Sequence, residues 1–290
     1  MTQRRHVDPY HSHSFAELCE LDTVYRDGLF DGQVVLITGA AGGIGQAMAV
    51  LFGRLGATIV ATGRTASSLD ALATNLDSIA VRCQTIAMTV RDPDAVRSSI
   101  EAVWHEQGRL DHVINNAGGQ FAAPAFDITP KGWNAVVETN MYGPWYMMQE
   151  SARRWAAEGT EGDIVNISTI QGRGGIGVPH TAAARAGGVA LTRTLAVEWA
   201  QYDIRVNSIG VGVVASEGLR NYPPEAQASF GHNPMRRLGD VWDIAQAAMY
   251  LAGPTGAFIT GTHLDVTGGE HVWGEYWPLG KPDYYRTDQD

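Results

Sequence analysis

The sequence predicts an α/β fold in which one doubly wound parallel sheet carries helices on both faces. Short apolar segments alternate with longer segments of helical periodicity, and the first apolar segment runs directly into a glycine-rich turn. The chain of 290 residues, 44% of them hydrophobic, is long enough for one sizeable core. We expect a single domain over residues 29–270, an N-terminal arm over residues 1–28 and an aromatic tail over residues 271–290.

The apolar segments predict about seven strands. Residues 33–38 are almost continuously apolar, as a central parallel strand buried on both faces requires. The further strands are expected at residues 57–62, 79–89, 112–115, 163–168 and 204–209, with residues 263–266 at the edge of the sheet. Helices are expected at residues 41–56, 93–107, 131–158 and 178–202. The helix at 93–107 has Asp92 as its N-cap and Pro93 in its first position.

Composition and charge exclude several classes of function. The formal net charge of −10 argues against binding to nucleic acid or to an anionic membrane surface. No segment approaches the roughly 18 apolar residues of a membrane-spanning helix. The cysteines, Cys19 and Cys83, form no metal or redox motif, which suits a reducing cytoplasm.

The two ends of the chain carry no recognised targeting signal. Charge at the start is not followed by the apolar segment of a secretory signal, and the final Thr-Asp-Gln-Asp is not a peroxisomal signal. We therefore expect a cytoplasmic protein. His6, His11 and His13 lack a carboxylate or cysteine at ligand spacing, so we expect a solvated arm and no metal site.

A glycine-rich turn follows the first predicted strand. Residues 38–45 read Thr-Gly-Ala-Ala-Gly-Gly-Ile-Gly and lead into the first helix. Glycine allows a tight turn that brings backbone N–H groups close to a pyrophosphate, and the helix N-terminus adds positive partial charge. The turn predicts a Rossmann-type dinucleotide site whose residues include Gly39, Ala41, Gly43, Ile44 and Gly45.

The end of the second predicted strand bears on the choice of dinucleotide. A carboxylate at this place would bind the ribose hydroxyls of NADH, but the residues are Ala-Thr-Gly followed by Arg64. The planar guanidinium of Arg64 suits a 2′-phosphate, which favours NADPH over NADH. The alternative is that Arg64 is a solvated loop charge.

Three further motifs give a family resemblance. Residues 111–118 read Asp-His-Val-Ile-Asn-Asn-Ala-Gly, residues 138–141 Glu-Thr-Asn-Met, and residues 204–207 Ile-Arg-Val-Asn. With the glycine-rich turn, they make the chain resemble the short-chain dehydrogenases/reductases over roughly residues 32–269. The resemblance implies a homotetramer, a water held by Asn140 in a proton relay, and further cofactor contacts. Those contacts are expected at Val90, Asn116, Ala117, Gly118, Arg185, Val213 and Val214.

A narrower likeness concerns one branch of this family. Residues 116–121 (Asn-Ala-Gly-Gly-Gln-Phe), 131–133 and 184–187 resemble the peroxisomal trans-2-enoyl-CoA reductases and 2,4-dienoyl-CoA reductases. This likeness implies an acyl-CoA substrate. Some bacterial dehydrogenases of terpenoid alcohols share the branch, so the likeness indicates a subfamily and leaves the substrate open.

The chain departs from the family at the position of its catalytic Tyr-x-x-x-Lys. Thr181 and Arg185 stand there instead. A threonine hydroxyl is a far weaker acid than tyrosine, and arginine keeps its proton near neutral pH. Ser168 and Thr169 compete for the position of the family's catalytic serine. The family's Pro-Gly after the sixth strand is Val-Gly here, at residues 211–212.

Reduction of an enoyl thioester fits these departures. Hydride addition at the β-carbon places negative charge on the thioester oxygen, where hydrogen-bond donors stabilise it. Candidate donors are Gln120, Ser168, Thr169 and Thr181. His180 is a titratable candidate, or else it faces solvent or caps a backbone group. Candidate contacts for CoA phosphates, otherwise surface charges, are Arg173, Arg220, Arg236 and Arg237.

Two alternatives remain open at this stage. The first is a carbonyl reductase or alcohol dehydrogenase on an apolar substrate, with His180 or Ser168 and a water replacing the tyrosine. The second is a family member that binds the dinucleotide without redox chemistry. The aromatic tail either covers an apolar substrate or packs at a subunit interface. Its residues are Trp273, Tyr276, Trp277, Tyr284 and Tyr285.

Overall fold

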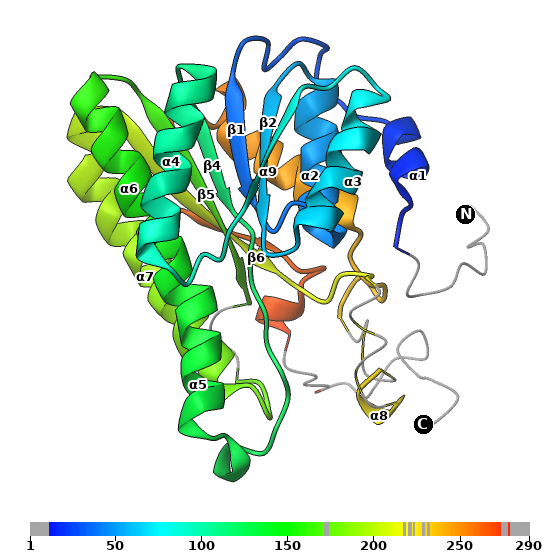
Figure 1. The fold of residues 1–290 in the computed structure, drawn as a ribbon. Coiled ribbons are helices and arrows are strands. Elements are labelled where there is room, and N and C mark those ends of the chain that lie inside the picture. Colours follow the sequence, from blue (N-terminus) through cyan, green and yellow to red (C-terminus); the bar gives the residue numbers. More distant parts are fainter. Residues whose placement is uncertain are drawn as a thin grey trace.

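The computed structural model describes residues 12–170, 174–216, 219, 222, 224–227, 230, 233–273 and 278. Its centre is a seven-stranded parallel sheet in the order β3-β2-β1-β4-β5-β6-β7 (Figure 1). The strands are β1 Val34–Thr38, β2 Thr58–Gly63, β3 Cys83–Ala87, β4 His112–Asn115, β5 Gly162–Thr169, β6 Ile204–Val211 and β7 His263–Val266. The doubly wound parallel fold predicted from the sequence is therefore confirmed, with β7 at the edge.

Helices cover both faces of the sheet. Figure 1 shows α2, α3 and α9 on one face and α4, α6 and α7 on the other. The α-helices are α1 Phe15–Glu20, α2 Gly43–Arg54, α3 Ala66–Asp77, α4 Pro93–Gln107, α5 Pro130–Val137, α6 Gly143–Glu158, α7 Pro179–Trp199, α8 Pro224–Gln227 and α9 Val241–Ala252. The short turns are η1 Ala125–Asp127, η2 Glu138–Tyr142, η3 Ala200–Tyr202, η5 Pro254–Gly256 and η6 Glu270–Val272. None of the described helices has the length and apolar character needed to cross a membrane.

The core explains why β1 is buried throughout and almost entirely apolar. Val35 and Ile37 pack with the helices of one face, and Leu36 packs with those of the other, as alternating strand residues must. The strand order reverses at β1, because β2 and β3 lie on one side of it and β4 to β7 on the other. Ligands bind in the crevice that such a reversal leaves at the carboxyl ends of the strands.

Several segments differ from the prediction. The helix expected at residues 131–158 is interrupted by the π-helical turn η2, which separates α5 from α6. The third strand is shorter than expected, because residues 79–81 close the end of α3 through a Val81 N–H bond to the Leu76 carbonyl. Four helices were not predicted: α1, α3, α8 and α9. In α3, three leucines stand among polar residues, and α9 packs against α2.

Part of the N-terminal arm, the helix α1, packs against α2, contrary to the solvated arm expected. Ser14 and Glu17 form a capping box at the start of α1, and Leu18 is only 1% exposed. The Arg54 guanidinium of α2 donates to the Leu18 carbonyl, and His13 pairs with Asp240 at 2.7 Å. Of the residues singled out at the two ends, the following lie outside the described part: His6, His11, Tyr276, Trp277, Tyr284 and Tyr285.

Candidate active site

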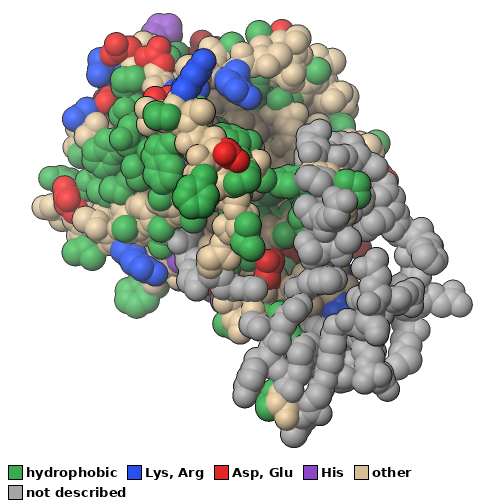
Figure 2. Space-filling view, turned by 90° about the horizontal axis from the view of Figure 1, so that it is seen from below, with side chains coloured by type: hydrophobic (Ala, Val, Ile, Leu, Met, Phe, Trp, Pro, Cys, Tyr) green, Lys and Arg blue, Asp and Glu red, His purple; other side chains and the backbone are tan. Residues whose placement is uncertain are grey.

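Three cavities lie along the carboxyl edge of the sheet. The dinucleotide cavity, about 500 Å³, extends from Gly39 to Arg64 and Val90. The central cavity, about 620 Å³, contains Ile44 and the loop after β6. The α7 cavity, about 320 Å³, is lined by Thr169 and Thr181 among others. Gln120 lines all three, so they form one continuous site. Figure 2 views the molecule from this edge, where Lys and Arg side chains lie beside a hollow of the surface.

The glycine-rich turn is shaped for a phosphate group. Gly39 and Gly43 adopt positive φ angles of 64° and 50°, which favour glycine. A Cβ on Gly45 would lie 2.2 Å from the Gly39 carbonyl oxygen, so α2 can approach the turn only without a side chain there. The N-cap of α2 is Gly42, which supplies no side-chain hydrogen bond to the first N–H groups of the helix. Those groups suit the pyrophosphate of a dinucleotide.

The loop after β4 holds this turn in place. The Asn116 side-chain Nδ2 donates to the carbonyls of Thr38 at 3.0 Å and of Gly39 at 3.1 Å. The Thr38 hydroxyl in turn accepts the backbone N–H groups of Asn116 at 3.0 Å and Ala117 at 2.9 Å. The ends of β1 and β4 are thereby tied together where the strand order reverses.

The outer end of the dinucleotide cavity carries two arginines. Arg64 is exposed and makes no ion pair with any described residue. Arg91, which sequence reasoning missed, donates to Glu138. Within the described part of the chain, no Asp or Glu lines this cavity.

Helix α7 presents Thr181 and Arg185 to the site. The Arg185 guanidinium donates to the Ile167 carbonyl and packs against Gly118, where a Cβ would lie 2.2 Å from Arg185 Nη2. Burial lowers the pKa of Arg185 to about 10, so it keeps its charge near neutral pH. Ser168 and Thr181 are 6% and 4% exposed, and neither side-chain oxygen has a hydrogen-bond partner among the described residues.

Asn140 lies in the π-helical turn η2 and braces the loop after β4. Its Nδ2 donates to the Gly119 carbonyl at 2.7 Å, and its Oδ1 accepts the Gly119 N–H at 3.1 Å. Both ends of the side-chain amide are therefore used for holding the backbone beside Gln120. π-helical turns of this kind occur frequently at functional sites.

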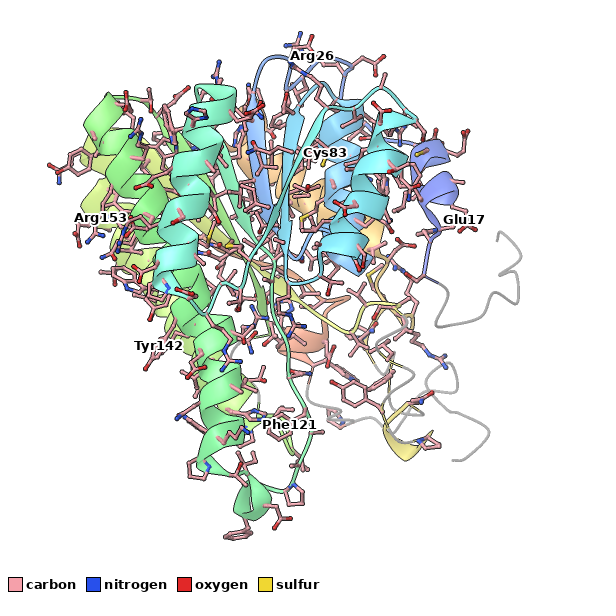
Figure 3. All side chains as sticks on the ribbon, viewed as in Figure 1. Glu17, Arg26, Cys83, Phe121, Tyr142 and Arg153 are labelled. Atoms are coloured by element: carbon pink, nitrogen blue, oxygen red, sulfur yellow. The ribbon has the colours of Figure 1, made fainter. Side chains whose placement is uncertain are left out.

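His180 is buried and does not face solvent. Its ring packs 4.6 Å from the ring of Phe121, which Figure 3 labels beside α5, and 6.4 Å from Trp133. Its Nδ1 accepts the Thr181 N–H at 2.8 Å, which is the capping role considered as an alternative. His180 does not line any of the three cavities.

The predicted residues divide into two groups by their place. Those that line the three cavities are Gly39, Gly43, Ile44, Arg64, Val90, Asn116, Ala117, Gly118, Gln120, Thr169, Thr181, Val213 and Val214. Those that lie behind the walls are Ala41, Gly45, Asn140, Ser168, His180 and Arg185. Arg237 lines a neighbouring cavity of about 370 Å³, which shares Gly212 and Val213 with the central and α7 cavities. Arg236 lines none of these cavities, and Arg173 and Arg220 lie outside the described residues.

Tyr222 and Glu270 are among the cavity residues that the sequence reasoning missed. Tyr222 lines the central cavity, and the Gln120 Nε2 donates to its hydroxyl at 2.8 Å. Glu270 lines the α7 cavity. Tyr222 lies in an irregular segment without a motif. Glu270 directly follows Gly268 and Gly269. This pair of glycines after the last strand is the sequence signal that could have indicated a turn at the site and drawn attention to Glu270.

Comparisons with known proteins cover nearly the whole domain. The family model described as enoyl-(acyl carrier protein) reductase matches residues 39–271. A probable 2,4-dienoyl-CoA reductase of Bacillus subtilis is 35% identical over 253 residues, which are 85% of this chain and 99% of that protein. A 3-oxoacyl-[acyl-carrier-protein] reductase of Thermotoga maritima is 31% identical over 82% of this chain and 98% of that protein. The solved structure of a citronellol catabolism dehydrogenase of Pseudomonas aeruginosa has a TM-score of 0.78 at 32% identity, over 87% of this chain and 100% of that one.

Proposed function

Since the chain belongs to the short-chain dehydrogenase/reductase family of NAD(P)-dependent oxidoreductases, we propose a specific reaction for it. In this proposal the protein uses NADPH to reduce a carbon–carbon double bond conjugated to a thioester, in an acyl-CoA. The proposal depends on one observation about the α7 cavity. Helix α7 places Thr181 in the wall of this cavity and Arg185 behind that wall, and neither side chain is an acid that could protonate a carbonyl oxygen. The similarity to a 2,4-dienoyl-CoA reductase supports the same substrate class.

The cavity residues suit a reaction that needs donors more than an acid. Bound NADPH supplies the hydride. Thr169, Thr181 and Gln120 line the α7 cavity, and in this proposal their hydroxyl and amide groups donate to a thioester oxygen that gains negative charge. One such donor is worth about 3–4 kcal/mol of transition-state stabilisation. The positive charge that Arg185 keeps near neutral pH, next to Gly118, favours the same build-up of negative charge.

The preference for NADPH is supported by the outer end of the dinucleotide cavity. Arg64 stands at the end of β2 without an ion-pair partner in the described part of the chain. A 2′-phosphate there would form charge-assisted hydrogen bonds with its guanidinium. NADH would leave that guanidinium in solvent.

A carbonyl reductase is the second candidate. Tyr222 brings a phenol to the central cavity, and its hydroxyl already accepts a hydrogen bond from Gln120, which reaches the α7 cavity. Such a phenol can donate a proton to a ketone oxygen. The similarity to a 3-oxoacyl-[acyl-carrier-protein] reductase favours this chemistry.

The test is NADPH oxidation followed by absorbance. Crotonyl-CoA, longer trans-2-enoyl-CoAs and a 2,4-dienoyl-CoA are compared with a panel of ketones, aldehydes and a 3-oxoacyl thioester. Turnover of the unsaturated thioesters that survives Tyr222→Phe supports the proposal. Turnover of carbonyl compounds alone, lost in Tyr222→Phe, overturns it in favour of the second candidate.

A further inference from the structure

A line of polar groups follows β7 behind the α7 cavity. His263 Nε2 lies 3.6 Å from Asp265 Oδ1, and Asp265 Oδ2 lies 3.9 Å from His271 Nε2 of η6. At its inner end His263 Nδ1 hydrogen-bonds with the Ser208 hydroxyl at 2.8 Å, and at its outer end His271 Nδ1 hydrogen-bonds with the Thr267 hydroxyl at 2.7 Å. The His263 side chain is 6% exposed and that of His271 30%, so the line leads from the interior toward solvent.

Gly210 connects this line to the candidate active site. In the sheet Ser168 of β5 is paired with Gly210 of β6, which is paired with Asp265 of β7. Paired residues of neighbouring strands share one face of a sheet, so Ser168 and Asp265 flank Gly210 on the same side. A Cβ on Gly210 would lie 2.6 Å from both Asp265 Oδ1 and His263 Nε2. Because Gly210 has no side chain, Asp265 Oδ1 and His263 Nε2 can occupy the space above it, on the same side of the sheet as Ser168.

The atoms that meet around Gly210 call for a further polar partner. Ser168 Oγ, His263 Nε2 and Asp265 Oδ1 are all buried, and none makes a hydrogen bond of normal geometry with a described residue. Buried polar atoms in proteins are nearly always paired, and bound water commonly serves where protein groups do not reach. The Thr169 carbonyl, which also interacts with His263, belongs to a residue that lines the α7 cavity.

We propose that Ser168, His263 and Asp265 form a water-linked proton path over Gly210, which supplies the α7 cavity in place of an acidic side chain on α7. This inference rests on the proposed function. In each turnover the dinucleotide is oxidised as its hydride, with the electron pair, moves to the substrate, which is reduced. The substrate also takes up one proton, which the path delivers and which solvent restores at His271. His263 and Asp265 are positioning residues, because they act through Ser168 and water.

The charges around His263 set the pH dependence of such a path. Arg193 faces it from α7, Asp265 from β7 and His271 from η6. Burial lowers the pKa of His263, Arg193 and His271 lower it further, and Asp265 and the Thr169 carbonyl oppose them. A group with a lowered pKa binds its proton only as the pH falls. Delivery through this path therefore slows as the pH rises.

Two variants interrupt the path in different ways. Asp265→Asn keeps the size of the side chain and removes its charge, and Gly210→Ala places a methyl group where Asp265 and His263 meet. In each we expect kcat with the enoyl-CoA substrate to fall roughly 100-fold, with KM little changed and the pH dependence of kcat flattened. Gly188→Ala is the matched control, because a Cβ on that glycine of α7 meets nothing within 4 Å.

A second measurement needs neither cofactor nor substrate. NMR of the imidazole groups follows the titration of His263 in the cofactor-free protein, and Ser168→Ala should shift that titration if water links the two residues. A wild-type kcat and pH profile in Asp265→Asn, in an enzyme that reduces enoyl-CoA, overturns the inference. If the wild-type protein reduces no unsaturated thioester, the proposed function fails, and the inference then depends on the NMR result: an unchanged His263 titration in Ser168→Ala overturns it.

Discussion

Replacing Arg64 with alanine tests the choice of dinucleotide. Arg64 is exposed at the end of β2 and lines the dinucleotide cavity. A hydrogen bond to a charged group contributes about 1.5–3 kcal/mol, and solvent screening at an exposed site reduces this to about 1–2 kcal/mol. Since 1.4 kcal/mol corresponds to a factor of ten, kcat/KM for NADPH should fall about 5- to 30-fold. The value for NADH should stay nearly constant, because NADH has no 2′-phosphate.

The assay measures initial rates with both dinucleotides at a fixed concentration of the accepted substrate. Arg82→Ala is the matched control. Arg82 is also an exposed arginine, but it directly precedes β3 and so lies at the amino ends of the strands, away from the dinucleotide cavity. The ratio of kcat/KM for NADPH to that for NADH should change in Arg64→Ala alone. An equal loss with both dinucleotides, or no loss, would refute the assignment of Arg64 to the 2′-phosphate.

Three further predictions concern the turn, the arginine of α7 and the N-terminal helix. Gly45→Ala forces a Cβ against the Gly39 carbonyl, so it should lower the unfolding free energy by about 1–3 kcal/mol and weaken dinucleotide binding. The control Gly188→Ala should change neither quantity. Thermal unfolding measures the stability, and a fluorescence titration measures the binding. Arg185 loses its charge only as the pH rises through about 10. If this charge contributes to catalysis, kcat should decrease near that pH, and Arg185→Lys should shift the pH at which the decrease occurs; the pH profiles of kcat measure this. Leu18→Ala should cost about 2–5 kcal/mol in urea unfolding, because Leu18 is 1% exposed; an unchanged midpoint would show that α1 does not stabilise the domain.

Local patterns in the sequence were sufficient for most of the sheet. The boundaries of β4, β7 and α4 agree with the prediction residue by residue, because apolar alternation, Asp92 and Pro93 mark them locally. The missed helix α3 buries only Leu69, Leu72 and Leu76 among polar residues, so its periodicity is weak. α1 carries a local start signal in Ser14 and Glu17, but the helix has only six residues and is stabilised by distant groups such as the Arg54 side chain.

The dinucleotide cavity was more predictable than the rest of the site. Glycines and Asn116 act through the backbone around them, so a motif carries their geometry. His180 shows the limit of sequence position, because it is next to Thr181 in the chain and yet packs behind Phe121 and lines none of the three cavities. Only tertiary packing determines which way such a side chain turns.

The polar groups on β7 show that sequence position also fails for residues that are far apart in the chain but close together in the fold. Asp265 and Ser168 are 97 residues apart in the numbering, and no motif joins them. Only the pairing of β5, β6 and β7 brings them to either side of Gly210. With Thr181 and Arg185 on α7 in place of an acid, reduction still needs a proton, and only β6 separates Ser168 of β5 from Asp265 of β7. If these groups supply that proton, their effect on catalysis will depend on Gly210 as strongly as on Asp265, because a Cβ on Gly210 would lie only 2.6 Å from Asp265 Oδ1 and from His263 Nε2.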